Sequence, residues 1–147
     1  MGAHPYYYSV KYQPDIEAAL QALRQREFAA GRYNPVEPFL DFPLRPNSPA
    51  PGAQHESIDG AREEAAEEGT RSILDIASTA VDPDFCVAAP LSAEALINAF
   101  GTAQPTKNDV DGKLDFLESI ERGHCIYFTI FKDGTANELF FAGYSFD

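Results

Sequence analysis

The strongest constraint on the fold is the dipeptide Asp133-Gly134, which lies between two runs rich in β-branched and aromatic residues. Asp-Gly suits the positive backbone angles of a type I′ turn, the tight connection between two antiparallel strands. The segment from Cys125 to Phe146 therefore predicts a β-hairpin that ends the chain.

This turn also predicts which hairpin residues face each other, because register follows from turn geometry. The expected pairs are Ile130 with Asn137, Phe128 with Leu139, and Ile126 with Phe141. One face then carries Ile126, Phe128, Ile130, Leu139 and Phe141, and the other Tyr127, Thr129, Phe131, Glu138, Phe140 and Tyr144. A sheet with one wet face alternates apolar and polar residues, so a hairpin that is apolar on both faces needs two covers.

Three alternatives could cover the second face: the proline-rich arm described below, further helices of the same chain, or another protein. Cover from the same domain is the usual solution. The functional alternative is a partner-binding or homo-oligomer surface. Its residues would be Tyr127, Phe131, Phe140 and Tyr144.

Strand and helix signals precede the hairpin. Apolar alternation predicts a strand over residues 6–12, and Asp15 caps a helix that ends at Gly31. Glu27 falls in the apolar stripe of this helix. Because buried carboxylates are rare, the favoured interpretation is that the last turn of the helix is exposed to solvent. The alternative is a buried ion pair between Glu27 and an arginine.

Further helices are predicted by capping residues and 3.6-residue periodicity. Helices are expected to begin at Ser57, Ser92 and Thr106. The apolar stripe of the first continues to Ala80, either as one helix or as a pair of helices kinked at Gly69. A short strand is expected over residues 85–89. The fold class is therefore α+β: an N-terminal strand and a C-terminal hairpin in a small antiparallel or mixed sheet, with about four helices between them.

Residues 32–56 form a proline-rich arm within a single domain of residues 1–147, a common length for one core. Six prolines exclude a regular helix or a central strand from the arm. Its first half is apolar and should pack on the body, whereas residues 46–54 should loop freely. Loops of this length are commonly functional or disordered.

The net charge and the absence of known motifs limit the classes of partner and cofactor that are expected. With 23 acidic and 11 basic residues the formal charge is −12, which disfavours nucleic acid and suits a basic protein. No signal peptide or membrane-length apolar run is evident, and two cysteines suit a reducing, cytoplasmic location. The histidines and cysteines lack metal-site spacing, and no cofactor or catalytic motif is present.

Three functions remain open. The first is a non-catalytic, immunity-like inhibitor that docks a basic protein through Glu63, Glu64, Glu67 and Glu68. The second is an enzyme or ligand binder with a site between the arm and the first strand, formed by His4, Tyr6, Tyr8 and Arg32. The third is a self-associating domain that uses the aromatic hairpin face.

Overall fold

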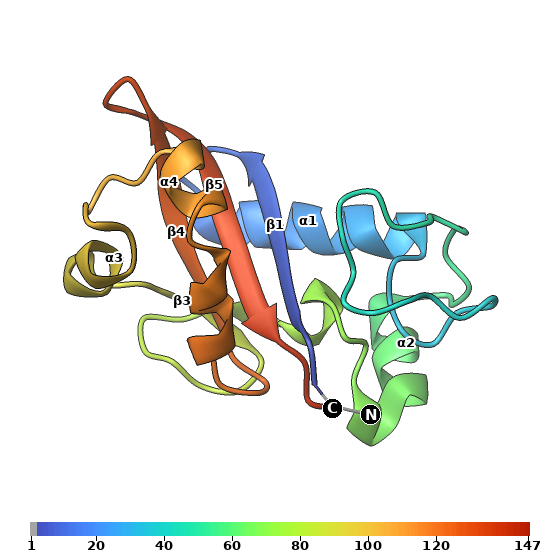
Figure 1. Ribbon diagram of the computed structural model, residues 1–147. Helices are drawn as coiled ribbons and strands as arrows, with labels where there is room; N and C mark the ends of the chain where they lie inside the picture. Colours follow the sequence, from blue (N-terminus) through green and yellow to red (C-terminus); the bar gives the residue numbers. More distant parts are fainter. Residues whose placement is uncertain (1–2) are drawn as a thin grey trace.

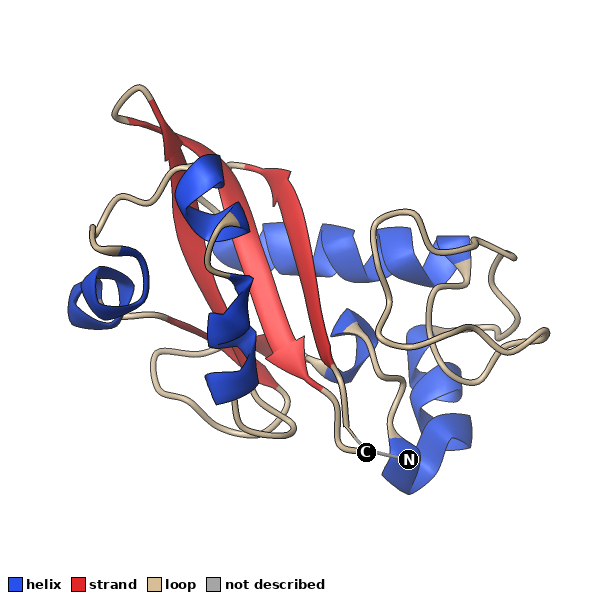
Figure 2. Cartoon of the chain, in the orientation of Figure 1, coloured by secondary structure: helices blue, strands red, loops and turns tan. Residues whose placement is uncertain are grey.

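A computed structural model describes residues 3–147 and contains one five-stranded mixed sheet (Figures 1 and 2). The strands are β1 (Pro5–Lys11), β2 (Ser78–Thr79), β3 (Val87–Pro90), β4 (Cys125–Lys132) and β5 (Thr135–Tyr144). Their order is β1-β5-β4-β3-β2; β5 is antiparallel to both β1 and β4, whereas β3 runs parallel to β4 and β2 parallel to β3. The predicted α+β class is confirmed, and β1 lies at one edge of the sheet.

Four α-helices occur in the described part of the chain, and each begins where a capping side chain was expected. They are α1 (Ile16–Ala30), α2 (Ile58–Ala65), α3 (Ala93–Phe100) and α4 (Lys107–Asp111). Their N-caps, Asp15, Ser57, Ser92 and Thr106, each accept a backbone N–H bond from the first turn. There are also three short 3₁₀ helices: η1 (Ala66–Glu68), η2 (Ile73–Asp75) and η3 (Leu114–Ser119).

Two predicted helices are shorter than their apolar stripes suggested. The helix from Ser57 ends at Ala65, because Ala66, Gly69 and Arg71 all have positive φ angles. The helix from Thr106 ends at Asp111 and is followed by η3 rather than by a continuous helix. The apolar positions beyond these ends, such as Ile73 and Leu117, are still buried.

The hairpin turn is confirmed, but the predicted pairs were wrong. Asp133 and Gly134 have φ angles of 53° and 76°. A bulge between Ile130 and Phe131 makes Asn137 an extra residue on β5, so every later pair shifts by one. The observed pairs are Ile130 with Glu138, Phe128 with Phe140, and Ile126 with Ala142. Bonds from outside the hairpin hold this region: Tyr12 N–H to the Asn137 carbonyl, and Phe131 N–H to the Pro105 carbonyl.

Both faces of the hairpin are covered by the chain itself. On one face Cys125, Leu139 and Phe141 pack with α1, α2 and the arm. On the other, Phe128 and Phe140 pack with residues of α3, α4 and η3. Figure 1 shows α1 behind the sheet and α4 in front of it. Among residues 3–147, no helix is both long and apolar enough to span a bilayer.

The arm is a long loop that packs beside the C-terminal end of α1. Val36, Leu40 and Leu44 are buried in the α1-side core, as expected for the apolar first half. The arm then returns to the helix, where the Gly52 N–H donates to the Ala30 carbonyl. This path places its middle section opposite β1 (Figure 1).

Candidate functional site

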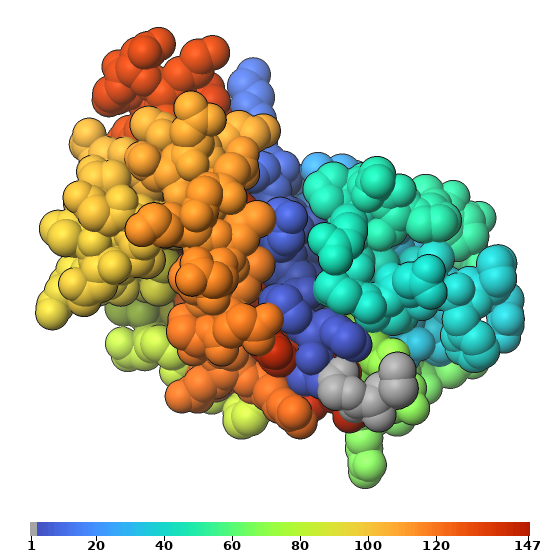
Figure 3. Space-filling model, viewed as in Figure 1, coloured from blue at the N-terminus to red at the C-terminus, as the bar shows by residue number. Residues whose placement is uncertain are grey.

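A cavity of about 690 Å³ lies along the outer edge of β1, and we call it the β1 groove. Figure 3 shows β1 as a strip of surface between the α4–η3 segment and the arm. The groove is lined by Tyr7, Tyr8, Ser9, Arg26, Glu27, Arg32, Leu44, Arg45, Pro46, Lys107, Asp111, Glu138 and Phe140. The lining therefore comes from five segments of the chain: β1, the end of α1 with the start of the arm, the middle of the arm, α4 and β5.

Every second residue of β1 directs its backbone N–H and C=O groups toward the groove. The His4 carbonyl accepts a bond from the Ser145 N–H, and the Tyr12 N–H donates to the Asn137 carbonyl, so the even-numbered residues bond to β5. Tyr7 and Ser9 must then direct their N–H and C=O groups outward. Within the described chain no protein group bonds to these outward N–H and C=O groups.

The opposite edge of the sheet is blocked by side chains. At β2, the Thr79 N–H donates to a Glu17 carboxylate oxygen at 2.8 Å. The nearby Ala77 carbonyl accepts a bond from Gln21 at 2.8 Å. The bond from Thr79 is the main cause that holds the pKa of Glu17 below its ordinary value. The chain therefore satisfies one sheet edge and leaves the other open.

The groove gathers positive charge in an acidic protein. Four of the 11 lysines and arginines line it, namely Arg26, Arg32, Arg45 and Lys107. Three carboxylates also line it, Glu27, Asp111 and Glu138. Neither Arg45 nor Lys107 forms an ion pair with any residue in the range 3–147.

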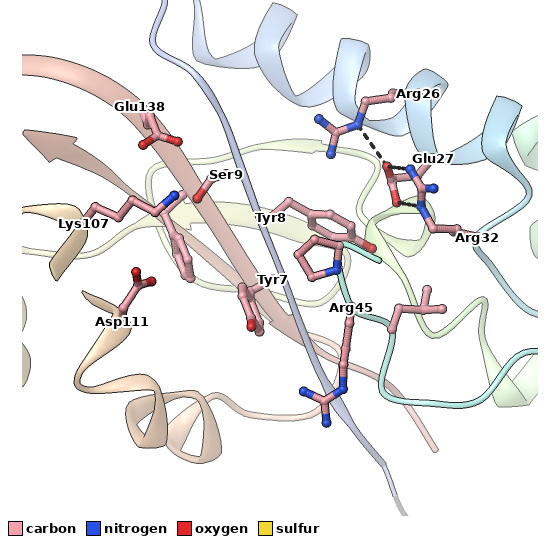
Figure 4. A pocket seen from close by; sticks show the side chains of 13 residues that line it. Tyr7, Tyr8, Ser9, Arg26, Glu27, Arg32, Arg45, Lys107, Asp111 and Glu138 are labelled. Carbon is pink, nitrogen blue, oxygen red and sulfur yellow. Dashed lines mark hydrogen bonds and ion pairs between the residues drawn. The ribbon is translucent and has the colours of Figure 1, made fainter. Parts of the chain in front are cut away.

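Glu27 organises the arginines on the α1 side. Its carboxylate accepts two bonds from Arg32, at 2.9 and 3.0 Å, and one from Arg26 at 3.0 Å (Figure 4). Glu27 is only 2% exposed, so the buried-pair alternative was right and the solvent-exposed interpretation wrong. The bonds to Glu27 raise the pKa of Arg32 above its ordinary value. This pairing fixes both guanidinium groups at the groove wall.

Tyr8 is suited to hydrogen bonding rather than to proton transfer. Burial, and then the nearby Glu27 charge, raise the pKa of Tyr8 well above its ordinary value. Its hydroxyl oxygen accepts the Ile73 N–H at 3.3 Å. A neutral phenol in this setting supports the wall of the groove and is a poor general base at neutral pH.

A second cavity of about 400 Å³ continues the groove toward the N-terminal end of β1. It shares Tyr7, Leu44 and Arg45 with the first cavity and also contacts His4 and Pro5. The two cavities together follow the strand rather than forming a round pocket.

The four ligand residues expected from sequence are only partly brought together. Tyr8 and Arg32 line the β1 groove, and His4 lines the adjoining cavity. Tyr6 is buried, with its ring against Gly143 on β5. Sequence reasoning missed Arg26, Arg45 and Lys107, because only the sheet order shows that α1, the arm and α4 flank β1.

The hairpin residues expected at a partner surface do not form one patch. Phe140 is buried and stacks on Tyr7 with ring centroids 5.7 Å apart. Tyr127 packs with the opposite core, on the other face of the sheet. Tyr144 donates a bond to Glu118 at 3.0 Å, and Phe131 is half-buried beside Pro105.

The acidic residues Glu63, Glu64, Glu67 and Glu68 are all exposed on α2 and η1. Two of them have partners within the chain: Glu64 bonds His55 at 2.7 Å, and Glu68 lies 4.0 Å from Arg71. Docking of a basic partner on this row stays a prediction. No group of three potential metal ligands occurs among residues 3–147.

Comparison with known protein families, with curated proteins and with solved structures finds no match for this chain. The geometry of the β1 groove is therefore the basis for assigning a function.

Proposed function

We propose that the protein is a binding protein that takes an anionic ligand in the β1 groove. One observation carries this proposal: four basic and three acidic side chains line one cavity, a small positive excess in a chain whose net charge is −12. Local charge of this kind concentrates oppositely charged ligands and fixes their orientation. The position agrees with the second function predicted from sequence, between the arm and the first strand.

Arg45 and Lys107 are the residues best placed to contact an anion directly. Both are exposed, and neither is neutralised by an ion pair within the described chain. They approach the strand from different sides, Arg45 from the arm and Lys107 from α4 (Figure 4). Arg26 and Arg32 share Glu27 and so contribute less free charge.

Binding is favoured over catalysis by the chemistry of the lining. Arginine and lysine side chains recognise anions, and the buried phenol of Tyr8 resists ionisation because its pKa is raised. The inhibitory, immunity-like function of the acidic row stays a prediction beside this proposal. It uses another surface and is compatible with an occupied groove.

Isothermal titration calorimetry with two anionic probes, pentaglutamate and tripolyphosphate, tests the proposal. The double variant Arg45→Gln, Lys107→Gln should weaken binding about tenfold or more, because a hydrogen bond to a charged group contributes about 1.5–3 kcal/mol. Lys132→Gln is the matched control, since Lys132 is an exposed cation at the hairpin tip, outside the groove. The proposal is wrong if neither probe binds, or if the control weakens binding as much as the double variant.

A further inference from the structure

We infer that the ligand of the β1 groove is an acidic peptide segment that binds in extended form and adds a sixth strand to the sheet beside β1. This inference rests on the proposed function, because it names the class of anion that the groove takes. Three observations carry it: the open strand edge, the elongated shape of the groove, and the placement of its charges.

The open edge supplies directed hydrogen bonds that a compact anion would leave largely unused. The outward N–H and C=O groups of Tyr7 and Ser9 repeat along the strand, at the spacing with which an extended peptide presents its own groups. Strand addition of this type obtains affinity from main-chain bonds and specificity from side-chain pockets.

The contrast between the two sheet edges strengthens the inference. Proteins commonly protect edge strands, because an open edge is a template for pairing with another chain. This chain blocks β2 with Glu17 and Gln21 but leaves seven-residue β1 open in its middle. Pro5 and Lys11, at the two ends of β1, limit the pairing to the segment between them.

The shape of the groove fits an extended chain. The cavities of about 690 and 400 Å³ adjoin along β1, from Ala3 at one end to Glu138 at the other. The arm and the α4–η3 segment form two walls with β1 between them (Figure 3). A peptide lying there would be held on both sides over several residues.

Charge indicates an acidic peptide rather than a neutral or basic one. Side chains of an added strand alternate between the two faces of the sheet. Those on the α1 face would meet Arg26 and Arg32, which share Glu27, and those on the α4 face would meet Lys107, with Asp111 and Glu138 also in the lining. Arg45 lies on the arm and would contact the outer side of the peptide. A second copy of this chain fits less well, because each copy carries −12 and repels the other.

The probe for the test is a fluorescein-labelled decapeptide of alternating Glu and Val, with an alternating Lys and Val decapeptide as its matched control. Fluorescence anisotropy should show binding of the Glu peptide and at least tenfold weaker binding of the Lys peptide. Two further Glu peptides, N-methylated at either the odd or the even residues, test strand pairing. One should bind like the parent and the other should lose binding, because only one set of N–H groups faces β1.

A protein variant tests the same bonds from the other side. Ser9→Pro removes an outward N–H and leaves the β5 ladder intact, whereas Ser9→Ala removes the same hydroxyl but keeps the N–H. Ser9→Pro should weaken binding of the Glu peptide at least fivefold more than Ser9→Ala does. Hydrogen exchange of the wild-type protein gives a readout that needs no variant: peptide should slow the amides of Tyr7 and Ser9.

The outcomes separate the two proposals. If tripolyphosphate and pentaglutamate bind but both N-methylated peptides bind like the parent, strand addition is overturned and anion binding stands. If no anionic probe binds, the proposed function itself fails. If sedimentation shows a dimer that the Ser9→Pro change dissociates, a second copy of the chain occupies the β1 edge, and this result also overturns the inference.

Discussion

At the scale of single residues, Glu27 shows how a charge is kept inside an apolar helix face. A buried carboxylate is costly unless its oxygens are bonded and its charge is paired. Arg32 supplies a two-bond pair from just beyond the helix, and Arg26 adds a third bond from the preceding position. The helix thus ends with its last turn tied to the start of the arm.

Glu27→Gln should lower the free energy of unfolding by about 2 kcal/mol, because the change leaves Arg32 without its charged partner at a mostly buried site. Arg26→Gln is the comparison, since the Arg26 side chain is 50% exposed and should contribute less than about 1 kcal/mol. Urea unfolding of both variants measures the difference. Equal losses would mean that burial of the pair is unimportant.

At the scale of elements, the hairpin has two buried faces, and a single bulge decides which β5 residues belong to each. Regular pairing would place Phe140 on the face of Tyr127. With Asn137 as an extra residue, Phe140 joins Phe128 instead, at a ring-centroid distance of 5.0 Å. Leu139 and Phe141 then face α1. Each core therefore receives a set of β5 side chains that the turn alone would have assigned to the other.

Double-mutant cycles on unfolding free energy test this register. Phe128→Leu and Phe140→Leu should couple by about 0.5–1.5 kcal/mol, the range typical of stacked aromatic pairs. Phe128→Leu and Leu139→Val should couple by less than about 0.5 kcal/mol, because these side chains lie in different cores. The leucine and valine changes keep the cores apolar. Stronger coupling in the second cycle would show that the regular register is the correct one.

At the scale of the whole molecule, the arm is closed onto the body by backbone contact. Gly31 caps α1 with φ +75°, and the backbone of Gly52 lies directly against it. A Cβ atom at Gly31 would overlap the Gly52 carbonyl oxygen. Tyr33 and His55 add a side-chain bond between the start and the end of the arm, at 2.9 Å. This closure positions Leu44 and Arg45 opposite β1 and so builds one wall of the groove.

Gly31→Ala should therefore open the return of the arm, at a cost of about 2–4 kcal/mol from overlap together with the left-handed backbone. Gly101→Ala is the matched control: Gly101 also caps a helix with positive φ, but a Cβ added there would have no other atom within 4 Å. It should cost about 1 kcal/mol. Thermal unfolding and limited proteolysis of the arm measure both effects. Similar losses would mean that the Gly31–Gly52 contact does not hold the arm.

The sequence by itself determined the local elements, because turns and caps depend on a few neighbouring residues. Asp133-Gly134, the four N-cap residues and the glycines that end α1 and α3 could be read from their chemistry. The α+β class and the two-sided apolar hairpin followed from the same patterns. For the candidate site, sequence indicated the place between the arm and the first strand, with Tyr8 and Arg32.

Only the tertiary structure decided the register, the covers and the site. The bulge at Asn137 is held by bonds that involve Tyr12 and Pro105, which local pairing rules do not include. The groove exists because β1 pairs with β5 alone and is left at an edge between the arm and α4. Contacts between residues far apart in the chain set this arrangement, and no local pattern of residues encodes them.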